Sequence, residues 1–114
     1  MVNKKALGEK GEEIAAKYLK NCGMEIITMN YRCKIGEIDI IAREGNTYVI
    51  CEVKYRSNNS FGYPIEAVDY KKQQKITQVT KHYIMTNRLP DDISVRFDVI
   101  GILGKKITHI KDAF

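Results

Sequence analysis

Two short runs of alternating apolar and polar residues meet at one tight turn in the first half of the chain. The runs span residues 35–43 and 47–54, and residues 44–46 join them. Such alternation around a Gly45-Asn46 pair predicts a β-hairpin. If that pair forms a two-residue turn, residues that face each other have numbers summing to 91. This register places Asp39 directly opposite Glu52.

The alternation also divides the hairpin's side chains between two faces of the predicted sheet. We expect one face to be charged and the other to be the apolar, core-facing side. The charged set is Glu37, Asp39, Glu52 and Lys54, and the apolar set is Ile38, Ile40, Ala42, Val49, Cys51 and Val53.

The opposed carboxylates of Asp39 and Glu52 would repel each other when both are ionised. A divalent cation bound between them removes this repulsion, and Mg2+ (or Mn2+) uses oxygen ligands and few protein carboxylates. The alternative is a solvated sheet face, where strand charges usually lie. The position of the acids near the middle of the strands, with Lys54 nearby on the same face, favours a metal site.

Helical spacing of apolar residues predicts a first helix over residues 4–22, ended by Gly23. Glu12 falls at the edge of its apolar stripe, whereas Glu13 points away from it. Gly8 and Gly11 lie on the buried side, where glycine lowers helix propensity. Their position predicts a close approach of this helix to another backbone.

The remaining elements complete the order α-β-β-β-α-β-β within a single domain, residues 1–114. Helices before and after the hairpin can cover its apolar face, which predicts an α/β fold with a mixed central sheet flanked by helices. The predicted segments are a strand at 24–31, a polar loop at 55–64, a helix at 65–87, a turn at 89–92, and strands at 95–103 and 106–110.

The second helix is predicted to carry Lys71, Lys75, Gln78 and His82 on its outer stripe. Lys72 and Gln73 fall on the buried arc instead. Side chains of this kind either extend along the rim of a sheet towards water or reach into a polar site. Both alternatives remain open at this point.

The charge distribution indicates a candidate phosphate-binding surface. The net charge is +5, and residues 70–90 contain five basic residues and no acidic one. A basic stripe of this kind is expected of a surface that binds nucleic acid, although a solvated basic helix gives the same pattern.

Cysteine, histidine and hydropathy patterns exclude several other classes of protein. The three cysteines, Cys22, Cys33 and Cys51, form no CxxC pair, which favours neither a disulfide framework nor a zinc site and fits a reduced, cytoplasmic setting. His82 and His109 are too isolated in the sequence to predict a histidine metal site or a catalytic triad. No segment approaches the ~20 apolar residues of a membrane span, so no membrane association is expected.

Asp39 followed by Glu52-x-Lys54 resembles the PD-(D/E)xK signature of restriction-endonuclease-like nucleases, with Ile38 in place of the proline. Nearly the whole chain resembles the bacterial YraN-like family, which is assigned to that fold and is similar to archaeal Holliday-junction resolvases. The matching motifs are Gly8-x-x-Gly11-Glu12-x-x-Ala15, Asn30-Tyr31-Arg32, Gly36-Glu37-Ile38-Asp39, Glu52-Val53-Lys54-x-Arg56, Phe61-Gly62, Ala67-Val68, Lys72-Gln73 and Arg96-Phe97-Asp98-Val99.

This resemblance implies catalytic and binding roles for particular residues. Asp39 and Glu52 would ligate Mg2+ or Mn2+, and Lys54 would orient or activate the attacking water. The family's helix-one glutamate falls on Glu12, which we include in the catalytic set. The nucleic-acid-binding set is Lys71, Lys72, Gln73, Lys75 and Arg56.

Two functions from different classes follow from these residues. The first is a metal-dependent endonuclease that hydrolyses phosphodiester bonds in DNA, including branched or damaged DNA. The second is a non-catalytic nucleic-acid-binding module, accessory to recombination, repair or DNA uptake. A protein-interaction role with a structural acid pair is a weaker third. Opposed carboxylates favour the endonuclease, because a binding module has no need of them. Some nucleases of this fold act as dimers, so the resemblance also allows a homodimer.

Overall fold

The computed structural model describes residues 4–56 and 68–114. In these ranges the helices and strands follow the predicted order α-β-β-β-α-β-β, and the predicted mixed α/β fold class is confirmed. The elements are α1 (Lys4–Asn21), β1 (Glu25–Arg32), β2 (Glu37–Glu44), β3 (Thr47–Arg56), α2 (Tyr70–Thr86), β4 (Ser94–Leu103) and β5 (Lys106–Ile110).

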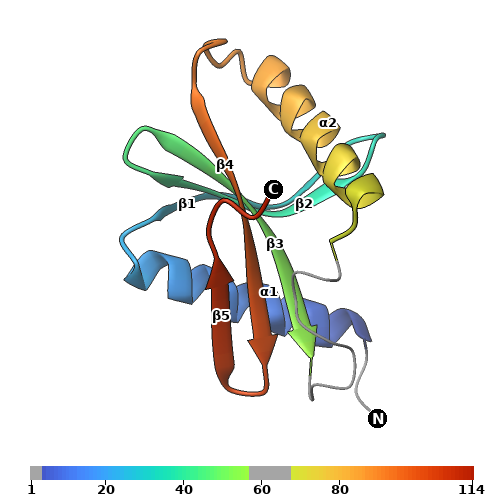
Figure 1. Ribbon diagram of the computed structural model, residues 1–114, viewed down its shortest axis with the longest axis vertical. Coiled ribbons are helices and arrows are strands. Elements are labelled where there is room, and N and C mark those ends of the chain that lie inside the picture. The colour runs from blue at the N-terminus through green and yellow to red at the C-terminus, as the bar shows by residue number, and fades with distance from the viewer. Residues whose placement is uncertain (1–3, 57–67) are drawn as a thin grey trace.

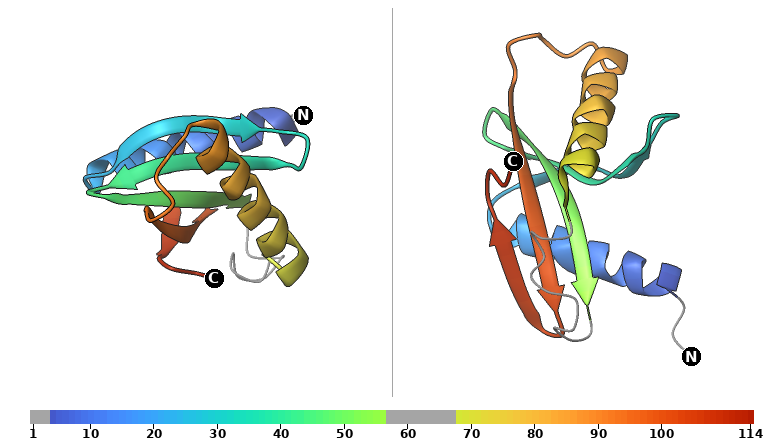
Figure 2. Two further views of the ribbon diagram at one scale, coloured as in Figure 1. Left: turned by 90° about the horizontal axis from the view of Figure 1, so that it is seen from above. Right: turned by 45° about the vertical axis from the view of Figure 1, so that its right-hand side comes forward.

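The strands form one mixed sheet in the order β1-β2-β3-β4-β5. β3 and β4 are parallel, because the segment that contains α2 returns the chain to the end of the sheet where β3 began. The other neighbouring pairs are antiparallel. α1 and α2 lie against opposite faces of this sheet (Figures 1 and 2).

Both faces of the sheet carry a buried apolar cluster, so the prediction that only one hairpin face is the core-facing side was wrong. α1 covers a cluster that includes Leu19, Ile40 and Cys51. α2 covers a second cluster that includes Ile50 and Val79. A helix on each face removes water from the whole centre of the sheet, and polar side chains there need partners.

The predicted hairpin register is confirmed over most of its length. Glu44 pairs with Thr47 across the Gly45-Asn46 turn, and the ladder continues to the pair Ile40–Cys51. Gly45 has a φ of +60°, a left-handed conformation that glycine adopts without steric cost. The ladder ends at Ile40, one pair before the predicted pairing of Asp39 with Glu52.

A break in alternation explains why the ladder ends there. Ile40 packs with the α1 cluster, but Ile38, two residues away, is buried in the α2 cluster. The prediction that Ile38 shares a face with Ile40 is therefore wrong. β1 shows the same break, because Met29 packs on the α1 side and Tyr31 on the α2 side.

Asn30 lies between the two β1 positions that change face. Its φ of +56° lies in the left-handed region, which Asn visits more readily than most residues. Met29 pairs with Ile40, and Tyr31 pairs with Ile38, so the breaks in the two strands lie side by side. Beyond this double kink, the end of the β1–β2 hairpin lies beside α2 (Figure 1).

α1 packs closely on β3 through Gly11, which confirms the prediction for this glycine, whereas the side-chain surroundings of Gly8 lie outside what the structure describes. A Cβ atom at Gly11 would lie 2.9 Å from the Cβ atom of Tyr55. The helix ends one residue before the predicted boundary, and Gly23 follows with a φ of +92°. None of the helices in the described ranges is long and apolar enough to cross a membrane.

α2 begins at Tyr70, later than the predicted start at residue 65. Asp69 is the N-cap, and its side chain accepts a hydrogen bond of 2.8 Å from the backbone N–H of Lys72. Apolar periodicity extends beyond this cap, but the cap fixes where the helix begins. The predicted helix residues 65–67 and the 57–64 part of the predicted loop lie outside the described residues, and residues 55 and 56 belong to β3.

Candidate active site

The side chain of Asp39 takes the place of the missing backbone ladder between β2 and β3. Its Oδ2 atom accepts a hydrogen bond of 2.8 Å from the backbone N–H of Val53. Since Val53 directly follows Glu52, this bond fixes the Asp39 carboxyl group beside the second acid of the predicted pair. The kink therefore turns Asp39 from a ladder residue into a site residue.

Glu52 lies on the α2 side of β3 and is only 7% exposed. Its Oε1 atom is 2.5 Å from Nζ of Lys72 on α2 and 3.4 Å from Nζ of Lys54 on the same strand. A buried carboxylate needs such partners, because burial without them carries a large desolvation penalty. Lys72 therefore reaches into a polar site, which decides one of the two alternatives that the sequence left open.

Burial, and after it the negative charge of Glu52, raises the pKa of Asp39 from 3.8 to about 7. The Val53 N–H and the more distant Lys72 oppose this shift only in part. Glu52 has two lysine partners, whereas Asp39 has mainly a neutral donor. The repulsion between the two carboxylates is therefore relieved by a proton on Asp39.

The two lysines of the site differ in their environments. Burial lowers the pKa of Lys54, and the neighbouring Lys72 lowers it further. Burial is also the largest single influence on Lys72 and lowers its pKa, but the interactions with Glu52, Lys54 and Asp39 together outweigh it, so the pKa of Lys72 is raised. Lys54 is the lysine better suited to exchange a proton, because its charged form is the less stabilised.

Glu12 brings a third carboxylate from α1. Burial raises its pKa, a side-chain hydrogen bond from Asn30 opposes the rise, and its charge acts on Asp39. Glu13 is exposed, as predicted. The close contact of Gly11 with β3 brings this part of α1 to the sheet.

The acidic pair suits a hard cation in its donor chemistry. Mg2+ is commonly held by one or two carboxylates, with water and phosphate oxygens completing its shell, and Asp39 and Glu52 supply that number. In the part of the chain that the structure describes, no group of three or more His, Cys, Asp or Glu side chains is arranged to hold a metal ion. A metal here would therefore need oxygens from water or a phosphate as well.

The predicted nucleic-acid-binding residues do not all lie in one place. Lys71 and Lys75 are exposed on α2. Gln73 donates a hydrogen bond of 3.0 Å to the Val68 carbonyl, so it holds the start of α2. The side chain of Arg56 and the matching residues Phe61, Gly62 and Ala67 lie outside the described residues.

Two further predicted positions have local partners. Glu37 accepts a hydrogen bond of 2.8 Å from Arg32 at the exposed end of the β1–β2 hairpin. His82, predicted on the outer stripe of α2, is partly buried, and its Nδ1 lies 2.7 Å from the hydroxyl of Tyr31. His82 therefore joins α2 to β1.

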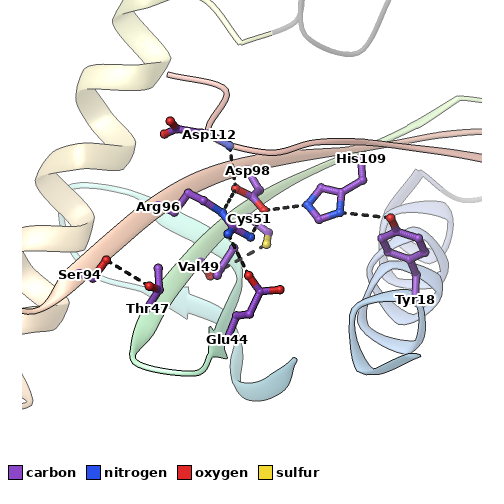
Figure 3. A network of polar contacts seen from close by, with 10 residues as sticks. All are labelled: Tyr18, Glu44, Thr47, Val49, Cys51, Ser94, Arg96, Asp98, His109 and Asp112. Atoms are coloured by element: carbon purple, nitrogen blue, oxygen red, sulfur yellow. Dashed lines mark hydrogen bonds and ion pairs between the residues drawn. The ribbon is translucent and has the colours of Figure 1, made fainter. Parts of the chain in front are cut away.

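A second polar network on the α1 side of the sheet was missed by the sequence analysis (Figure 3). Asp98 is fully buried and accepts hydrogen bonds from Arg96 at 2.9 and 3.0 Å and from the backbone N–H of Asp112 at 3.1 Å. The Nε2 atom of His109 lies 2.7 Å from Asp98, and its Nδ1 lies 3.2 Å from the hydroxyl of Tyr18. His109 is thus not isolated.

The sequence contained one sign of this network, but that sign did not show which residues would become partners. Arg96 and Asp98 alternate on one strand, and Arg96 also donates to Glu44 at 3.0 Å. Burial raises the pKa of Asp98, but the bonds from Arg96 and His109 lower it below its ordinary value. This network joins α1, β2, β4, β5 and the C-terminal segment, and its donors satisfy Asp98, which indicates a structural role.

Comparison with known proteins identifies relatives over nearly the full length. Residues 11–102 match the family described as "Uncharacterised protein family UPF0102". A UPF0102 protein of Lachnoclostridium phytofermentans is 48% identical over 99% of this chain and 96% of its own length. UPF0102 proteins of Clostridioides difficile and Alkaliphilus oremlandii are 48% and 49% identical over 99% of this chain and 100% of their own lengths. The chain therefore belongs to the UPF0102 family.

Proposed function

We propose that this protein is a metal-dependent endonuclease that hydrolyses phosphodiester bonds in DNA. The observation that carries the proposal is the pairing of a buried Glu52 with an Asp39 whose pKa is about 7, beside a lysine of lowered pKa. Perturbed acids and bases gathered at one place are typical of catalytic sites.

Asp39 and Glu52 would hold Mg2+ or Mn2+, which neutralises charge on the phosphate and lowers the pKa of a bound water. Lys54 then has a role of its own. Its ammonium group can donate hydrogen bonds to the attacking water and to the charge that develops on the phosphate oxygens. Glu12 supports the site from α1 by adding negative charge near Asp39.

The basic face of α2 would bind the DNA backbone next to this site. Lys72 joins the two regions, because its Nζ contacts Glu52 while 40% of its side chain remains exposed. Lys71 and Lys75 are exposed on the same helix. Lysines placed in this way can hold phosphates in the neighbourhood of the acids.

Cleavage of a small panel of DNAs tests the proposal. Branched, single-stranded and duplex DNAs would be incubated with and without Mg2+ or Mn2+, and metal binding would be measured by calorimetry. We expect cleavage only with metal. Asp39→Asn should weaken metal binding, whereas Lys54→Ala should retain metal and lose cleavage, because its role is at the nucleophile.

Exposed residues of the same types provide matched controls. Asp92→Asn removes a carboxylate from the exposed turn before β4, and Lys105→Ala removes an amine from the exposed turn after it. Neither change should alter cleavage. If calorimetry detects no divalent metal at millimolar concentration, with or without DNA, the endonuclease proposal fails.

The alternative is a nucleic-acid-binding module without catalysis, and one contact favours it. Glu52 already has Lys72 at 2.5 Å and Lys54 at 3.4 Å, so its charge is balanced by the protein alone. Lys72→Met separates the two functions. In an endonuclease it should leave metal affinity unchanged or increase it, because the lysine competes for Glu52. In a binding module it should reduce DNA affinity and produce no metal binding.

A further inference from the structure

Asn30 lies where the irregular backbone meets the acidic site. Its φ of +56° is left-handed, and the alternation of both β1 and β2 changes at this point. In a regular antiparallel pair, Met29 and Tyr31 would share one face, and so would Ile38 and Ile40. Here each pair is divided between the α1 and α2 clusters.

The kink has a direct effect on Asp39. The β2–β3 ladder ends at Ile40, and the N–H of Val53 is bound by the Asp39 side chain. A regular strand would pair these residues through the backbone and leave the carboxylate without this donor. The break in β2 at Asp39 lies beside Asn30, because Met29 pairs with Ile40 and Tyr31 pairs with Ile38.

The side chain of Asn30 has a second effect. It hydrogen-bonds to Glu12, the carboxylate that α1 contributes. An amide donor bound to a carboxylate restricts its orientation, as partners of metal ligands commonly do. One residue therefore influences two acids of the site, Asp39 through its backbone and Glu12 through its side chain.

We propose that Asn30 is a positioning residue of the acidic site, with its left-handed backbone placing Asp39 and its amide orienting Glu12. This inference rests on the proposed function, because it concerns the same metal-binding acids. The two actions are separable by substitution. Asn30→Gly keeps the left-handed conformation and removes the amide, whereas Asn30→Ala removes the amide and disfavours the conformation.

Three measurements on the intact protein test the two actions: Mn2+ affinity by calorimetry, melting temperature without metal, and hydrogen exchange at the Val53 amide. Asn30→Gly should keep Val53 protected and lower Mn2+ affinity about tenfold. Asn30→Ala should also lower the melting temperature and expose Val53 to faster exchange. Asp112 provides a matched control, because its φ is +52° in the exposed C-terminal segment and aspartate, like asparagine, tolerates this conformation better than alanine does. Asp112→Ala should cost similar stability and leave Mn2+ affinity and Val53 exchange unchanged.

A double-mutant cycle shows whether the amide acts through Glu12. If it does, Asn30→Gly should have no further effect on Mn2+ affinity once Glu12 is changed to Gln. An Asn30→Gly protein that binds Mn2+ as tightly as the unmodified protein, while Glu12→Gln binds more weakly, would overturn the side-chain role. Val53 exchange in Asn30→Ala that matches Asp112→Ala would overturn the backbone role.

Failure of the proposed function gives a different result. The unmodified protein would then bind no Mn2+, and the role of Asn30 in orienting a metal-binding Glu12 would fall with it. The Val53 exchange of the Asn30 variants would still decide the backbone role, because that bond joins two groups of the protein itself.

Discussion

The Asp39 carboxylate binds the backbone N–H of Val53 at 2.8 Å, just beyond the point where the ladder between their strands ends. This contact joins the fold to the candidate chemistry. A backbone donor cannot rotate away as a side chain can, so it fixes the acid at low entropic cost. Burial, and after it the charge of Glu52, still raises the pKa of Asp39 to about 7, because this neutral donor opposes the shift only in part.

Stability should fall as pH rises from about 4 to about 7. The folded state keeps a proton on Asp39 up to a pKa of about 7, whereas the unfolded chain loses it near 3.8, so deprotonation favours unfolding in this interval. Asp39→Asn should remove most of this slope and stabilise the metal-free protein at pH 8 by about 1–3 kcal/mol. Urea unfolding at several pH values measures the effect, and Asp92→Asn is the control. An unchanged slope in Asp39→Asn would contradict the raised pKa.

Charge reversal on α2 should weaken DNA binding in a salt-dependent way. Lys71→Glu with Lys75→Glu should lower the slope of log affinity against log salt by about 0.9 for each DNA phosphate that the helix no longer binds. Lys105→Glu with Lys106→Glu makes the same change in net charge at the exposed β4–β5 turn. Equal effects of the two double variants would show that only net charge matters, and no effect would identify Lys71 and Lys75 as a solvated helix face.

Gly11→Ala should destabilise the protein although alanine favours helices. The gain in helix propensity is about 1 kcal/mol, but the new methyl group would lie 2.9 Å from the Tyr55 Cβ atom, and overpacking of this kind costs about 1–3 kcal/mol. The helix should shift away from β3 and carry Glu12 with it, so Mn2+ affinity should also fall. Glu13→Ala, on the exposed side, should change neither quantity. A more stable Gly11→Ala protein would show that α1 has room to adjust.

Asp98→Asn should destabilise the protein by about 2–4 kcal/mol at neutral pH, because Arg96 and His109 lose a buried charged partner. The folded pKa of Asp98 is lowered, so its contribution is complete above the unfolded value near 3.8 and is lost as pH falls through the lower, folded value. The difference between Asp98→Asn and the unmodified protein should therefore shrink below about pH 4. Asp112→Asn, whose side chain is exposed, should have little effect at any pH. Chemical unfolding from pH 2 to pH 8 measures both variants.

The sequence determined most of the fold through local signals. Gly45-Asn46 fixed the hairpin register because only a two-residue turn brings Glu44 against Thr47. Apolar spacing predicted both helices, and Gly11 marked the close contact of α1. These features depend on residues near each other in the chain, which is why pattern alone reveals them.

The candidate site was predicted only in part, because its geometry depends on a departure from regular structure. Alternation assumes an unbroken strand, so it placed Ile38 with Ile40 and extended the ladder to Asp39 and Glu52. Asparagine adopts ordinary strand conformations as well as left-handed ones, and nothing in the sequence around Asn30 distinguishes the two.

Tertiary packing decided which polar groups became partners. Lys72 reaches Glu52 because α2 lies over that face of β3, and His109 meets Asp98 because β5 pairs with β4. Lys72 and Glu52 lie on a helix and a strand, and His109 and Asp98 lie on two neighbouring strands. Both contacts therefore join residues that are not close in the sequence. The sequence therefore determined which residues could carry the chemistry. Only the packing of α1, α2 and the kinked β1–β2 hairpin decided which of these residues meet, because a buried charge requires a partner that is close in space rather than in sequence.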